Sequence, residues 1–79
     1  MVDISKLKIG QKVHYAPSYM KENGEYENGI VKEIPEHSIT EVRVVYNCDS
    51  DWKRFMEYTS ALTIVSDLYM GWKHDTVEN

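Results

Sequence analysis

The segment Thr40-Glu41-Val42-Arg43-Val44-Val45-Tyr46 decides the fold class of this chain. Hydrophobic residues occupy positions 42, 44 and 46, and charged residues occupy positions 41 and 43. This two-residue period is typical of an antiparallel strand with one buried face and one solvated face. We therefore expect a strand over residues 39–46 and a hydrophobic core beneath it.

Further short segments with the same character lie on both sides of this strand. Residues 13–15, 29–34 and 58–65 are rich in Val, Ile, Thr and Tyr, which favour strands. Pro17, Asn23-Gly24 and Pro35 separate them, and residues 18–28 read as a loop. Residues 3–7 and 66–70 each predict one capped helical turn. The sequence thus predicts an all-β fold, a small antiparallel barrel of four to five strands with one-turn helices.

The order of these signals resembles Tudor-like and other SH3-type small β-barrels. The resemblance rests on Gly10-Gln11-Lys12-Val13-His14-Tyr15 as a first strand, Gly29-Ile30-Val31 as a second, and a closing turn at Asp67-Leu68. It spans roughly residues 7–72. The Asn-Gly-Ile-Val-Lys and Asp-Trp segments are also similar to small uncharacterised proteins of bacteria and their phages, a resemblance that implies no activity.

The bulk properties of the chain narrow the classes of protein that it can belong to. Its 79 residues predict one domain over residues 1–72 and a flexible tail over 73–79. The single cysteine, Cys48, and the absence of a signal-peptide pattern predict a cytoplasmic protein. No apolar run approaches the ~18 residues that span a bilayer, so no membrane partner is expected. The net charge of −4 makes nucleic acid a less favoured partner.

The most informative candidate site is a group of aromatic and acidic residues after the central strand. Rings at interfaces supply large rigid contact areas, and ring faces beside carboxylates attract cations. Three interpretations remain open: the rings form the core, they bind a protein or peptide, or they form the methyl-cation cage that the Tudor resemblance implies. Trp52 is either an exposed anchor or a lid on the barrel. The residues proposed for partner binding are Tyr46, Asp49, Asp51, Trp52, Phe55 and Tyr58.

No pattern in the sequence indicates catalysis, a metal or a cofactor. Cys48 and the three histidines lack the spacing of metal ligands, and no nucleophile stands near a base at a recognisable spacing. The leading expectation is a non-enzymatic protein- or peptide-binding module that uses the aromatic and acidic face. The alternative is a nucleic-acid-associated barrel that uses exposed aromatics and lysines. Open strand edges also make a homodimer an expectation.

Overall fold

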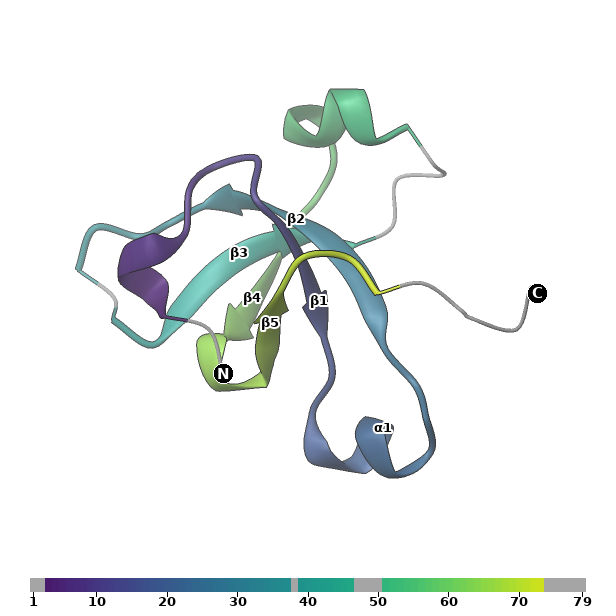
Figure 1. Ribbon diagram of the computed structural model, residues 1–79. Coiled ribbons are helices and arrows are strands. Elements are labelled where there is room, and N and C mark those ends of the chain that lie inside the picture. The colour runs from purple at the N-terminus through teal and green to yellow at the C-terminus, as the bar shows by residue number, and fades with distance from the viewer. Residues whose placement is uncertain (1–2, 38, 47–50, 74–79) are drawn as a thin grey trace.

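A five-stranded antiparallel sheet forms the body of the protein (Figure 1). The computed structural model describes residues 3–37, 39–46 and 51–73. The strands are arranged in the order β4-β3-β2-β1-β5. This confirms the predicted all-β class. The strands are β1 (Lys12–Tyr15), β2 (Glu27–Glu33), β3 (Glu41–Val45), β4 (Ala61–Ile64) and β5 (Leu68–Met70); the helices are η1 (Ile4–Lys6), α1 (Ser18–Glu22), η2 (Trp52–Glu57) and η3 (Val65–Asp67).

Strand alternation sorts the side chains onto two faces of the sheet. The inner face carries the core, in which Val13, Val31 and Val44 are fully buried. The outer face carries the residues between them, such as Lys12 and His14 on β1. The whole core cluster consists of Leu7, Val13, Val31, Val42, Val44, Val65 and Leu68.

The connection between β1 and β2 differs from the predicted loop. Residues 18–22 form α1, a single α-helical turn that begins after Pro17. Proline suits this position because its fixed φ angle leads into a helix and its missing N–H is not needed there. Gly24 then takes a φ of 73°, and the chain turns into β2. In Figure 1, α1 and η2 lie at opposite ends of β1 and β2.

The last strand is also a correction to the sequence-based prediction. Residues 66–70 were expected to form one helical turn, but the helical turn is η3, over residues 65–67, and residues 68–70 form β5. β5 pairs with β1, with Tyr15 opposite Leu68. Ala16 N donates to Asp67 O at 2.9 Å and extends this pairing by one bond. Leu68 thereby enters the core and is fully buried.

The described residues contain no helix long and apolar enough to cross a membrane.

Candidate functional site

The structure separates the predicted aromatic and acidic group into two places. Trp52, Phe55 and Tyr58 lie on or directly after η2, whereas Tyr46 follows β3 and packs against the core. Asp51 immediately precedes η2. Asp49 lies outside the described residues, as does Cys48. The described members of the predicted set therefore do not form one cluster.

Asp51 is held by its own segment. Its carboxylate accepts a hydrogen bond from the Tyr58 hydroxyl at 3.2 Å and lies 3.4 Å from Arg54 Nη1. Arg54 also pairs with Glu57 at 2.8 Å, and this bond raises the pKa of Arg54. Lys32 Nζ donates to Tyr58 O at 2.6 Å and ties the end of η2 to β2. Asp51 thus has internal partners that compete with any ligand for its charge.

The helix η2 covers one end of the outer face. Ile30 and Val45 are register partners on that face, yet they are only 5% and 0% exposed. Phe55 packs beside Gly10, where an added Cβ would lie 3.8 Å from Phe55 Cζ. η2 thus lies against β2 at this end of the sheet, and Phe55 packs beside Gly10.

Trp52 meets a ring that the sequence did not place beside it. The ring centroids of Trp52 and Trp72 lie 4.8 Å apart with an interplanar angle of 54°. Trp72 Nε1 donates to Gly29 O at 2.8 Å, and Lys12 Nζ lies 4.6 Å from the centroid of the Trp72 ring. Both tryptophans are half-buried. They border a pocket of about 470 Å³ that also includes Lys12 and Lys53.

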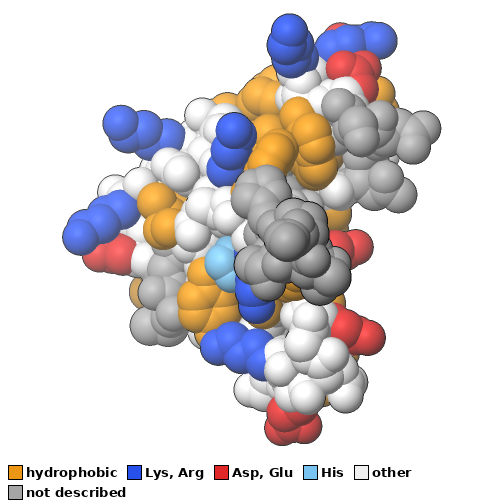
Figure 2. All heavy atoms as spheres, turned by 45° about the vertical axis from the view of Figure 1, so that its right-hand side comes forward, with side chains coloured by type: hydrophobic (Ala, Val, Ile, Leu, Met, Phe, Trp, Pro, Cys, Tyr) orange, Lys and Arg blue, Asp and Glu red, His pale blue; other side chains and the backbone are white. Residues whose placement is uncertain are grey.

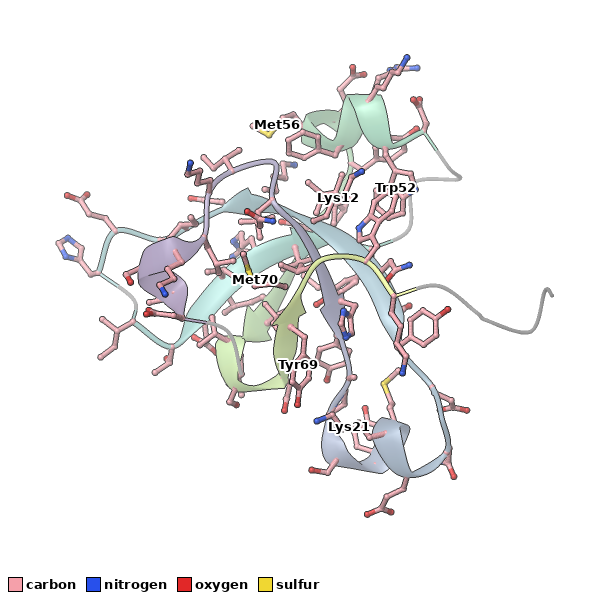
Figure 3. All side chains as sticks on the ribbon, in the orientation of Figure 1. Lys12, Lys21, Trp52, Met56, Tyr69 and Met70 are labelled. Atoms are coloured by element: carbon pink, nitrogen blue, oxygen red, sulfur yellow. The ribbon has the colours of Figure 1, made fainter. Side chains whose placement is uncertain are left out.

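The outer face continues from Trp72 toward α1 with more rings and lysines (Figure 3). His14 stacks on Tyr69 at 5.3 Å, and Tyr26 meets His14 edge-on at 6.5 Å. Lys21 Nζ donates to the Tyr69 hydroxyl and lies 4.2 Å from the ring centroid. Lys73 Nζ lies 5.3 Å from the Tyr26 ring. We call this surface the basic aromatic face; its residues are Lys12, His14, Lys21, Tyr26, Trp52, Tyr69, Trp72 and Lys73.

A second aromatic group lies on the inner side of the strands. Tyr15 and Tyr46 meet edge-on with ring centroids 5.8 Å apart. The register partners of Tyr15 are Glu27 on β2 and Leu68 on β5. Asp67 directly precedes Leu68 in the chain. The two tyrosines, Glu27 and Asp67 border one pocket of about 320 Å³ together with Thr63. We call it the tyrosine pocket.

Burial and the two nearby carboxylates raise the pKa values of both phenols. Burial is the main cause that raises the pKa of Tyr46 to about 12, and the charges of Glu27 and Asp67 add to the effect. The pKa of Tyr15 is raised by burial first, then by its hydrogen bond with Tyr19 and by the same two carboxylates. In the described part of the chain, neither Glu27 nor Asp67 makes a side-chain hydrogen bond or ion pair. The pocket therefore combines two rings with two carboxylates that have no ion-pair partner among the described residues.

The Tyr46 hydroxyl anchors the wall of this pocket. It lies 2.8 Å from Thr63 Oγ1, which itself donates to Ala61 O at 3.2 Å. Because the Thr63 proton is used by Ala61, Tyr46 is the donor to Thr63. Thr63 is the one buried polar residue among those described.

Replacing this hydroxyl gives a pH-dependent prediction. Tyr46→Phe is expected to lose about 0.5–1.5 kcal/mol of stability at pH 7 with the bond to Thr63. The folded pKa is raised, so the unfolded chain ionises first, near pH 10, and the wild type loses stability as pH rises from about 10 to 12. Urea denaturation should thus show the two proteins converging at alkaline pH. A constant difference would contradict the raised pKa. Tyr26→Phe is the control, because the Tyr26 hydroxyl makes no hydrogen bond with another described residue.

Sequence reasoning missed Tyr15, Glu27 and Asp67 as members of one site. The β1–β2 register brings the first two together, and the β1–β5 pairing adds the third. It also missed the ring partners of Trp52 and His14, since Trp72 and Tyr69 are distant in the chain.

Among the residues described, no three His, Cys, Asp or Glu side chains lie close enough together to hold a metal ion.

Comparison with known proteins adds no assignment. No protein-family model matches the chain, and neither a curated protein nor a solved structure matches it significantly.

Proposed function

We propose that this protein is a non-enzymatic protein- or peptide-binding module that accepts a basic side chain of its partner in the tyrosine pocket. The observation that carries the proposal is the pair of carboxylates, Glu27 and Asp67, that border a pocket with two tyrosine rings and make no hydrogen bond or ion pair with another described side chain. A Lys or Arg side chain brings the opposite charge, and its apolar stem packs against rings. The site is an aromatic and acidic one, as the sequence predicts, but Tyr46 alone is shared with the predicted set.

We further propose that the sheet curls into an SH3-type small barrel of the Tudor-like kind. β4 and β5 are the two edge strands, yet only η3, three residues long, joins them. A flat five-stranded sheet would hold its edges about 19 Å apart, at roughly 4.8 Å per strand. A 3₁₀ turn of this length spans only about 8 Å. A strongly bent sheet brings β4 and β5 close enough for this short turn to join them. It leaves the tyrosine pocket at an open end.

The partner's charge can be tested with small peptides. The probe is an acetylated and amidated Gly-Lys-Gly peptide, compared with its Arg and norleucine counterparts, titrated into labelled protein and followed by NMR. We expect the Lys and Arg peptides to shift the resonances of Tyr15, Tyr46 and Thr63, and the norleucine peptide to leave them unchanged. Equal shifts from norleucine would reduce the pocket to an apolar one.

Matched carboxylate variants test the source of the selectivity. Glu27→Gln and Asp67→Asn should each weaken binding of the Lys peptide about two- to thirtyfold, the range that one cation–aromatic or charge contact supplies. Glu36→Gln removes the same charge from an exposed residue in the loop after β2 and should have no effect. If all three variants bind equally, the tyrosine pocket does not bind the cation.

A further inference from the structure

We propose that the basic aromatic face binds a single strand of nucleic acid, with bases stacked on its rings and phosphates beside its lysines. This site is separate from the tyrosine pocket. On β1, Lys12 and His14 point to the outer face, whereas Tyr15 belongs to the inner pocket. The effect of a substitution on one face can therefore be measured without disturbing the site on the other face.

The local charge of this face is opposite to that of the whole chain. The formal net charge is −4, but three lysines, Lys12, Lys21 and Lys73, lie against its rings. Asp51, beside Trp52, is already compensated by Arg54 and by the Tyr58 hydroxyl. In the view of Figure 2, hydrophobic side chains, some Lys or Arg side chains and one His lie on the middle of the visible face, and other basic side chains extend at its left and top outline. A polyanion is complementary to such a surface.

The rings supply the second component of single-strand binding. Every described ring of the face is half-buried, so each is fixed by packing while part of it stays accessible. Trp72 is oriented by its bond to Gly29, and His14 by the 2.9 Å bond between Nδ1 and Gly71 O. Fixed rings lose little entropy when a base stacks on them, and base stacking tolerates any sequence.

The spacing of these elements follows the strand direction. Lys12 and His14 are two residues apart on β1, so their side chains project about 7 Å apart on the same face. Lys12 lies over Trp72, and His14 stacks on Tyr69. Lys21, from α1, lies over the Tyr69 ring, so each of the two places along β1 combines a lysine with a ring, as an extended chain of alternating phosphates and bases requires.

The test is fluorescence anisotropy of a 5′-labelled twelve-nucleotide oligothymidine titrated with the full chain at several salt concentrations. We expect binding at 50 mM salt that weakens as salt rises, because phosphate contacts release counterions. Trp52→Leu should weaken binding about fivefold or more, the effect of losing one stacked base. No anisotropy change at 50 mM salt would overturn the proposal, whatever the variants do.

Two double variants with equal loss of charge make the test specific to the face. Lys12→Gln with Lys73→Gln should weaken binding and lower the salt slope by about 1.4, two phosphate contacts at roughly 0.7 each on a single strand. Lys6→Gln with Lys8→Gln, on η1 and the loop after it, should change neither by a comparable amount. Equal effects of the two pairs would show nonspecific attraction and overturn the site.

A competition experiment distinguishes nucleic acid from an anionic protein as the partner of the basic aromatic face. Unlabelled polyglutamate should not displace the oligothymidine at equal charge concentration, since it has no bases to stack. Displacement at equal concentration would assign the face to acidic peptides and overturn the nucleic-acid proposal. Neither result bears on the tyrosine pocket, because Glu27→Gln is expected to leave oligothymidine binding unimpaired.

Discussion

Leu68→Ala should lower the free energy of unfolding by about 2–5 kcal/mol, the largest effect that we expect from a single substitution. Leu68 is fully buried and belongs to the core cluster. It lies on β5 opposite Tyr15, directly after η3. Removing three carbons there leaves a cavity that the short edge strand cannot close without losing its pairing to β1. Urea denaturation followed by circular dichroism measures the change.

The control for this prediction is the same substitution at an exposed leucine. Leu62 on β4 is 50% exposed, so Leu62→Ala should cost well below 1 kcal/mol. Both variants remove the same atoms from a strand, and only the burial differs. If the two lost similar stability, Leu68 would not be part of the core and the pairing of β5 with β1 would be wrong.

Gly29→Ala is the second large effect, and its cause is space rather than backbone conformation. A Cβ on Gly29 would lie 2.6 Å from Val44 Cγ1 and 2.9 Å from both Val45 O and Tyr46 Cδ1. The Val45 oxygen belongs to the neighbouring strand and cannot move away on its own. We expect a loss of about 1–3 kcal/mol, typical of overpacking. The displaced Tyr46 ring should also disturb the tyrosine pocket, which its aromatic NMR resonances would show.

Gly24 provides the contrasting control. It has a positive φ of 73° and no atom within 4 Å of an added Cβ. Asparagine tolerates this conformation, so Gly24→Asn should cost less than Gly29→Ala. The reverse order would mean that the crowding between β2 and β3 is relieved by small shifts of the strands.

The strands that the sequence predicted are those in which hydrophobic and polar residues alternate over enough positions to be recognised. β3 has hydrophobic residues at 42 and 44 and charges at 41 and 43, and its partner β2 has a similar apolar centre. Two elements carried no such signal. α1 has five residues, barely more than one helical turn, and β5 has three, fewer than two periods of a strand. Tertiary pairing with β1, rather than local preference, decides the conformation of β5.

The candidate sites were predictable only where neighbours in space are also neighbours in sequence. Trp52, Phe55 and Tyr58 were grouped because they fall within one short segment, and they do share η2 and its end. Tyr46 was grouped with them for the same reason, but its side chain points toward Tyr15 and Thr63. Trp52 meets Trp72, twenty positions later in the chain, and His14 meets Tyr69, fifty-five positions later, through the β1–β5 register. Register of this kind cannot be read from composition or local pattern.

The placement of β4 and β5 at the two ends of the sheet order sets a condition on how the chain folds during synthesis. β1 can complete its pairing only after β5 has been synthesised, because Tyr15 pairs with Leu68, fifty-three positions later. Pairing between such distant segments is slow, since the entropy of closing a long loop is lost before any stabilising contact forms. The meander from β1 to β4 emerges from the ribosome earlier, with one side of β1 still open. The core, to which Leu68 belongs, is therefore completed only by the last strand of the sheet to be synthesised.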